Sequence, residues 1–180
     1  MVTFVPLALR WKAFNLCPGN GFASDRYRAI EIERCMMKIL GEWEDTPYNT
    51  KFADKGVGVY CSAFVCRVLD ELYQREPTAL PAIPADIGFH SREGAAAGLH
   101  WFMRTYPAFK KLQGIEIEPG DILITGPVGG GPGHAMIVGP RENTLWQADE
   151  GGVHYTGMSL PDSYELYDVF RSTDREKWFR

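Results

Sequence analysis

Apolar residues recur every three or four positions in three stretches of the chain, which is the period of one helical face. The strongest pattern predicts a helix from about Cys61 to Gln74. Two further patterns predict helices over Asp25–Leu40 and Glu93–Tyr106. The proline-rich run Glu76–Pro84 predicts a loop between the second and third helices.

Beyond residue 120 the apolar runs are shorter and are bounded by turn-forming residues, a pattern that predicts strands. Because the helices come first and the strands follow, we expect an α+β fold in which a mostly antiparallel sheet packs on the helix that begins at Cys61. The expected strands are Asp121–Thr125, His134–Val138, Thr144–Ala148, Gly152–Thr156 and Tyr167–Arg171.

Cys61 opens the predicted central helix. The glycines of Lys55-Gly56-Val57-Gly58 place a loop just before it, so the cysteine falls in or near the first helical turn. There the unpaired backbone amides and the positive end of the helix dipole favour a thiolate over a thiol, and the same amides can stabilise an oxyanion. On the helix alone, a buried core thiol is the commoner explanation, because free cysteine is among the most buried residue types.

A histidine and a glutamine further along the chain favour the chemical explanation. His134 opens a predicted strand after the glycine-rich connection Gly126–Gly133. Gln147 is a polar residue inside the next apolar strand, where it could accept a hydrogen bond from the imidazole and fix its tautomer. A solvent-facing strand position explains Gln147 about equally well. Three rival bases remain: His90, His100 and His154.

Four short motifs follow one another in the order seen in a known family. They are Thr46-Pro47-Tyr48, Tyr60-Cys61-Ser62-Ala63-Phe64, Pro119-Gly120-Asp121-Ile122-Leu123, and Gly133-His134-Ala135-Met136-Ile137-Val138-Gly139 followed by Leu145-Trp146-Gln147-Ala148. Across roughly Ile39 to Phe170 the chain resembles the NlpC-type cell-wall cysteine peptidases, which have a papain-like α+β fold. It is most similar to the variants found in bacteriophage tails and gene-transfer particles.

The resemblance implies a role for each motif residue and requires no cofactor. Cys61 would be the nucleophile, His134 the general base and Gln147 the polar residue that orients the base. The residues expected to bind substrate or stabilise the oxyanion are Tyr48, Tyr60 and Ser62.

The chain departs from the family pattern at two places beside the nucleophile. The family usually has Asp immediately before the cysteine and Gly two residues after it, where this chain has Tyr60 and Ala63. In members that cut stem peptides with a free amino terminus, that aspartate helps to hold the amine. Because Tyr60 cannot supply the same charge, we expect the reaction class to be retained and the substrate preference to differ.

Length and charge narrow the possible organisation and partners. At 180 residues we expect a single catalytic domain over residues 1–180, with an N-terminal extension at 1–24 and an insert at 77–113 that shapes the substrate cleft. A net charge of −4 without a cluster of basic residues argues against a nucleic-acid partner.

The four cysteines are not spaced as zinc ligands, so we expect no metal site. Cys66 lies about 500° around the helix from Cys61 and is expected to pack in the core. Cys17 and Cys35 could pair in an oxidising compartment, although free thiols suit a chain that needs a reduced nucleophile.

The first sixteen residues lack the features of a secretory signal, and no apolar run is long enough to span a membrane. We therefore expect synthesis in the cytoplasm and delivery to the cell wall by a phage-type particle or by lysis, or else action inside the cell.

Three functions fit these observations. The first is a thiol hydrolase that cuts amide or isopeptide bonds in peptidoglycan peptides through a thioester. The second has the same triad but acts as an acyltransferase or as an amidase on another substrate. The third is a catalytically idle particle protein in which Tyr60 marks the loss of substrate binding.

Overall fold

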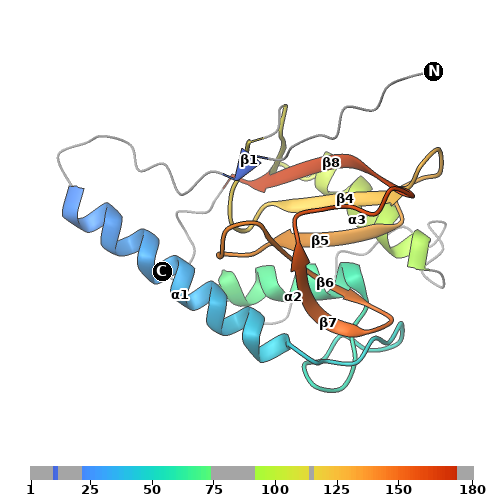
Figure 1. Ribbon diagram of the computed structural model, residues 1–180, viewed down its shortest axis with the longest axis horizontal. Coiled ribbons are helices and arrows are strands. Elements are labelled where there is room, and N and C mark those ends of the chain that lie inside the picture. The colour runs from blue at the N-terminus through green and yellow to red at the C-terminus, as the bar shows by residue number, and fades with distance from the viewer. Residues whose placement is uncertain (1–9, 12–21, 74–91, 114–115, 174–180) are drawn as a thin grey trace.

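The computed structural model describes residues 10–11, 22–73, 92–113 and 116–173 (Figure 1). Within these ranges it contains three helices and eight strands, so the predicted α+β class is confirmed. The elements are β1 (Arg10–Trp11), α1 (Phe22–Trp43), α2 (Cys61–Leu72), α3 (Arg92–Thr105), β2 (Phe109–Lys111), β3 (Glu116–Ile117), β4 (Ile122–Pro127), β5 (His134–Val138), β6 (Thr144–Asp149), β7 (Gly152–Gly157) and β8 (Tyr164–Ser172).

Six of the strands form one antiparallel sheet in the order β2-β8-β4-β5-β6-β7. The strands β4, β5, β6 and β7 follow one another as hairpin neighbours, whereas β8 returns to the other side of β4. Figure 1 shows β8, β4 and β5 side by side, with α2 next to β5 and β6. The remaining two strands, β1 and β3, form a small parallel pair.

The helix α2 packs at the centre of the domain, and most of its side chains are buried there. It contacts α1, α3, β5 and β6. Its largest apolar side chain, Phe64, is fully buried and meets the ring of Trp43 edge to face, with 5.9 Å between ring centroids. Truncating such a residue to alanine costs about 3–5 kcal/mol, so this contact anchors α2 firmly.

Successive apolar side chains along the central strands point to opposite faces of the sheet, and both faces are buried. Ile122 and Ile124 of β4 belong to the main core with α2, whereas Leu123 faces a second apolar cluster on the other side. Ile117 of β3 joins that second cluster. The sheet is therefore a rigid base on which side chains at strand ends are held in place.

Several predicted boundaries were wrong in instructive ways. The first helix extends from Phe22 to Trp43, so it takes in the last residues of the predicted extension 1–24 and continues past Gly41 to the buried Trp43. Packing of this tryptophan outweighs the low helix propensity of glycine. The three shortest strands, β1, β2 and β3, were not predicted.

The predicted insert 77–113 is only partly described. Its C-terminal part forms α3 and β2, whereas residues 77–91, including most of the predicted loop at 76–84 and His90, lie outside the described residues. Helix α3 packs against α2 and β5, the two elements that begin at Cys61 and His134. Among the described helices, none combines the length and hydropathy needed to cross a membrane.

Candidate active site

The start of α2 leaves the positive end of the helix available to Cys61. Tyr60 is the N-cap residue, with extended φ and ψ of −108° and 164°, and its side chain does not cap the helix. No acidic residue occupies the first turn. Because no carboxylate compensates the helix dipole, its field favours a negative charge on the Cys61 sulfur.

The Cys61 thiol is fully buried, with 0% of the residue exposed. Burial by itself raises the pKa of this thiol, but hydrogen bonding and charge from His134, the Ala135 backbone amide and the Ser62 hydroxyl outweigh it. The pKa of Cys61 is consequently lowered from its ordinary value. The Ser62 hydroxyl lies 3.7 Å from the sulfur. The site therefore makes the thiol more acidic in spite of its burial.

Strand register brings His134 and Gln147 together. Met136 of β5 lies opposite Gln147 of β6, so His134, two residues earlier on the same face, is a diagonal neighbour within reach of a long side chain. The His134 Nε2 and Gln147 Oε1 atoms are 2.8 Å apart. The hydrogen bond expected between the imidazole and Gln147 is thus present.

This hydrogen bond determines which imidazole nitrogen can act as a base. An amide oxygen only accepts hydrogen bonds. Nε2 of His134 must therefore carry a proton and donate a hydrogen bond to the Gln147 oxygen. The other nitrogen, Nδ1, is buried and has no oxygen or nitrogen hydrogen-bond partner in the described part of the chain. Its lone pair is therefore available to receive the proton of Cys61, whose pKa the imidazole lowers.

The glycine-rich connection before His134 is held in place by its own backbone. The amide of Gly133 donates to the Thr125 carbonyl at 2.8 Å, and that of Gly130 donates to the Pro127 carbonyl at 2.9 Å. A Cβ at Gly126 would lie 2.1 Å from the Gly131 carbonyl oxygen, so only glycine permits the loop to fold back this closely. The loop thereby delivers His134 to a defined place at the start of β5.

The Thr46-Pro47-Tyr48 motif lies beside the residues that lead into Cys61. The amide of Val59 donates to the Pro47 carbonyl at 2.9 Å, and the amide of Val153 in β7 donates to the Thr46 carbonyl at 2.8 Å. Half-buried Tyr48 pairs with Val59 in a short bridge. This segment therefore connects the residues before Cys61 to the edge strand of the sheet.

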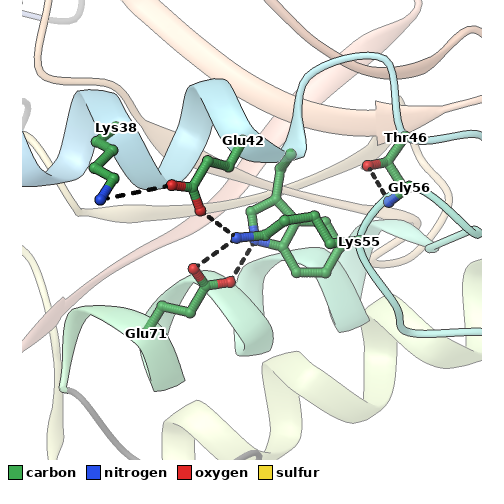
Figure 2. A network of polar contacts seen from close by, with 7 residues as sticks. Lys38, Glu42, Thr46, Lys55, Gly56 and Glu71 are labelled. Atoms are coloured by element: carbon green, nitrogen blue, oxygen red, sulfur yellow. Dashed lines mark hydrogen bonds and ion pairs between the residues drawn. The ribbon is translucent and has the colours of Figure 1, made fainter.

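A polar network fixes the loop between the motif and α2 (Figure 2). Lys55 Nζ donates to Glu42 of α1 at 2.8 Å and to Glu71 of α2 at 2.9 Å, while Trp43 Nε1 donates to the other Glu71 oxygen at 2.7 Å. Burial lowers the pKa of Lys55, but the two carboxylates outweigh it and raise the pKa overall. The Gly56 amide donates to the Thr46 hydroxyl at 3.0 Å. The middle of the loop before Cys61, at Lys55 and Gly56, is thus held.

Tyr60, the residue before Cys61, is half-buried. Burial is the main cause that raises the pKa of its hydroxyl, and the charges of Cys66 and Cys61 add to it. Tyr60 therefore presents a neutral hydroxyl next to Cys61 in the sequence. Cys66, which is partly buried against the core, has its pKa raised to about 12, mainly by burial, so it is a poor nucleophile.

The described rival histidines contact other partners. His154 of β7 contacts the Gln147 amide, with 3.2 Å between the two Nε2 atoms. His100 of α3 contacts Asp168 of β8 at 2.6 Å. Sequence reasoning missed the contact of His154 with Gln147, although the short turn between their strands would have placed them opposite each other.

Within the described residues, no group of three or more His, Cys, Asp or Glu side chains is arranged to hold a metal ion. Comparison of the chain with protein-family models and with curated proteins finds no match to either. What can be said about function therefore depends on the motif residues and their geometry.

Proposed function

We propose that the protein is a cysteine hydrolase that cuts amide or isopeptide bonds in peptidoglycan peptides. The observation that carries the proposal is the position of His134, with Nε2 hydrogen-bonded to Gln147 at 2.8 Å and Nδ1 left without an oxygen or nitrogen partner beside a thiol of lowered pKa. Nucleophile, base and orienting residue are the parts that covalent catalysis by cysteine requires.

The reaction follows from the protonation states of these groups. His134 Nδ1 takes the proton of Cys61, and the thiolate attacks the carbonyl carbon of the scissile bond. Backbone amides at the start of α2 stabilise the oxyanion. His134 then gives its proton to the leaving amine as the C–N bond breaks, which leaves a thioester on Cys61. Water attacks the thioester, His134 removes the proton of the water, and the free thiol is restored with release of the acid.

The substrate class and the papain-like arrangement belong to the proposal through the resemblance to NlpC-type peptidases. A helix that begins at the nucleophile and packs on antiparallel strands bearing the base and the orienting residue supports this arrangement. A phage-type particle or lysis would deliver the enzyme to the wall. Tyr48, Tyr60 and Ser62 would bind the peptide or assist the oxyanion.

Acyl transfer is the second candidate, and the burial of Cys61 favours it. A thioester on a sulfur with 0% exposure is shielded from water, so an amine acceptor that fills the site could react before water does. The same triad serves both outcomes, because His134 can remove a proton from an amine as well as from water.

Purified protein incubated with peptidoglycan sacculi tests the proposal, with released fragments identified by mass spectrometry. Hydrolysis predicts new muropeptide termini, and acyl transfer predicts fragments joined to an added amine. The Cys61→Ala variant should abolish both, whereas Cys66→Ala on the same helix should retain activity. Failure to release or transfer fragments from several wall types would contradict the proposal and favour an idle particle protein.

A further inference from the structure

His154 joins the candidate triad through the side of Gln147 that faces away from His134. It lies directly opposite Gln147 in the register of β6 and β7, so both side chains emerge on the same face of the sheet. Their Nε2 atoms are 3.2 Å apart, and the other ring nitrogen of His154 lies 3.1 Å from the Gly152 carbonyl oxygen. An unbroken chain of hydrogen bonds therefore runs from the backbone of β7 to His134.

The direction of every hydrogen bond in this chain is set by the carbonyl at its end. A carbonyl oxygen can only accept, so Nδ1 of His154 must carry a proton. In the neutral ring Nε2 is then an acceptor, which obliges the Gln147 amide nitrogen to face it. The Gln147 oxygen consequently faces His134, whose proton must sit on Nε2.

We propose that His154 is a positioning residue that holds His134 in its reactive tautomer through Gln147. Neither His154 nor Gln147 needs to touch the substrate. Reversing the Gln147 amide would place its NH₂ group against His134 Nε2 and shift the proton of His134 to Nδ1, the nitrogen that must be vacant to accept the Cys61 proton. This inference rests on the proposed role of His134 as the base.

We call the hydrogen-bonded chain from Gly152 through His154 and Gln147 to His134 the relay. The backbone conformation of Gly152, where the relay begins, is constrained. Gly152 has a φ of +93°, and a Cβ at this position would lie 2.8 Å from the Thr46 carbonyl oxygen, so other residues are strained there. Asp149 is the competing partner of His154, with 3.6 Å between its Oδ2 and His154 Nε2. Because Gln147 is nearer, at 3.2 Å, the amide is the hydrogen-bond partner of His154.

The tautomers can be measured directly by long-range ¹H–¹⁵N correlation spectra of the full chain labelled at its four histidines. Cys61→Ala serves as the parent, because it removes the thiol that would exchange its proton with Nδ1 of His134. We expect the Nδ1–H tautomer for His154 and the Nε2–H tautomer for His134. Finding the Nε2–H tautomer at His154 in this parent would overturn the relay, and this result needs no further variant.

Substitutions at position 154 then test the coupling. His154→Leu removes the acceptor, so the ratio of Nε2–H to Nδ1–H forms of His134 should fall about fivefold, as expected for one neutral hydrogen bond. His154→Gln can repeat the relay and should keep a larger ratio, while His100→Leu, which removes a histidine paired with Asp168, should leave it unchanged. Equal ratios in the Leu and Gln variants at position 154, or no fall in either, would refute the coupling.

These measurements use no substrate, so the relay and the proposed function can fail separately. If the expected tautomers are found but no cell wall is hydrolysed, the proposed function is refuted and the relay stands. If the protein hydrolyses the wall but substitutions at position 154 do not change the His134 tautomer, the proposed function stands and the relay is refuted.

Discussion

Replacing His134 with alanine should raise the pKa of Cys61. Burial is the largest influence on this thiol and raises its pKa, and the hydrogen bond and charge of His134 are the next largest and lower it. Without the imidazole, the Ala135 amide and the Ser62 hydroxyl alone oppose burial. We therefore expect the pKa of Cys61 to rise in His134→Ala.

The size of the effect follows from the strength of the lost interaction. A hydrogen bond to a charged group contributes about 1.5–3 kcal/mol, which corresponds to a roughly ten- to hundredfold smaller thiolate population at about pH 6. Exposure predicts a different order of reactivity, because Cys35 and Cys66 are partly exposed whereas Cys61 is at 0%. With a pKa of about 12, Cys66 has roughly one thiolate in a million at about pH 6.

Site-resolved alkylation separates ionisation from access. The native protein is treated with iodoacetamide at about pH 6, and the modified peptides are followed over time by mass spectrometry. Cys61 should react before Cys35 and Cys66 in the parent, and its rate should fall ten- to hundredfold in His134→Ala. His100→Ala, in which a histidine on α3 is removed, is the matched control and should leave the order unchanged.

Two results would refute this reasoning. If Cys61 reacts last in the native parent, access and not acidity governs the thiol, and the imidazole does not activate it. If Cys61 reacts first but at the same rate in His134→Ala, its ionisation comes from the helix and its neighbouring donors, and His134 has no part in it.

Three other substitutions test separate parts of the site and fold. Gln147→Ala should lower turnover on muropeptides about tenfold without abolishing it, because one neutral hydrogen bond that orients the base is lost. Tyr60→Asp should raise the rate for peptides with a free amino terminus relative to blocked ones, because a carboxylate beside the nucleophile can hold the amine. Asp168→Asn should destabilise the fold by about 1–3 kcal/mol near neutral pH in urea unfolding, because the buried carboxylate bonds His100 and Lys111.

The last of these predictions has a definite pH dependence. Burial raises the pKa of Asp168, but His100 and Lys111 outweigh it and hold the pKa below its ordinary value of 3.8. The carboxylate therefore stabilises the fold at pH values above this ordinary value, and the contribution is lost as the pH falls through the lowered native pKa. The gap in stability between parent and Asp168→Asn should close in acid, and a gap that stays constant would contradict the assignment.

Each of the other two predictions has its own decisive outcome. A loss in Gln147→Ala as large as that in His134→Ala would mean that Gln147 does more than orient the ring. An unchanged ratio of free to blocked peptides in a well-folded Tyr60→Asp protein would mean that Tyr60 does not face the substrate. Circular dichroism and the unfolding midpoint provide the control for folding in both cases.

Local pattern alone determined the start of α2 at Cys61, the bounds of β5 at His134–Val138 and the order of helices before strands. These features are visible in the sequence because hydrophobic period, glycine loops and apolar runs act over a few neighbouring residues. The shortest strands, β1, β2 and β3, were missed because two or three residues carry no measurable period.

Only the tertiary structure decided how the polar groups of the site are connected. Alternation left Gln147 equally suited to solvent or to His134, and strand register placed it between His134 and His154. From the sequence, a buried thiol and an activated thiol were competing explanations of Cys61, whereas in the structure Cys61 is fully buried and yet has a lowered pKa. Register and burial depend on contacts between residues far apart in the chain, so local pattern could nominate the chemical groups but could not determine which atom of each faces the next.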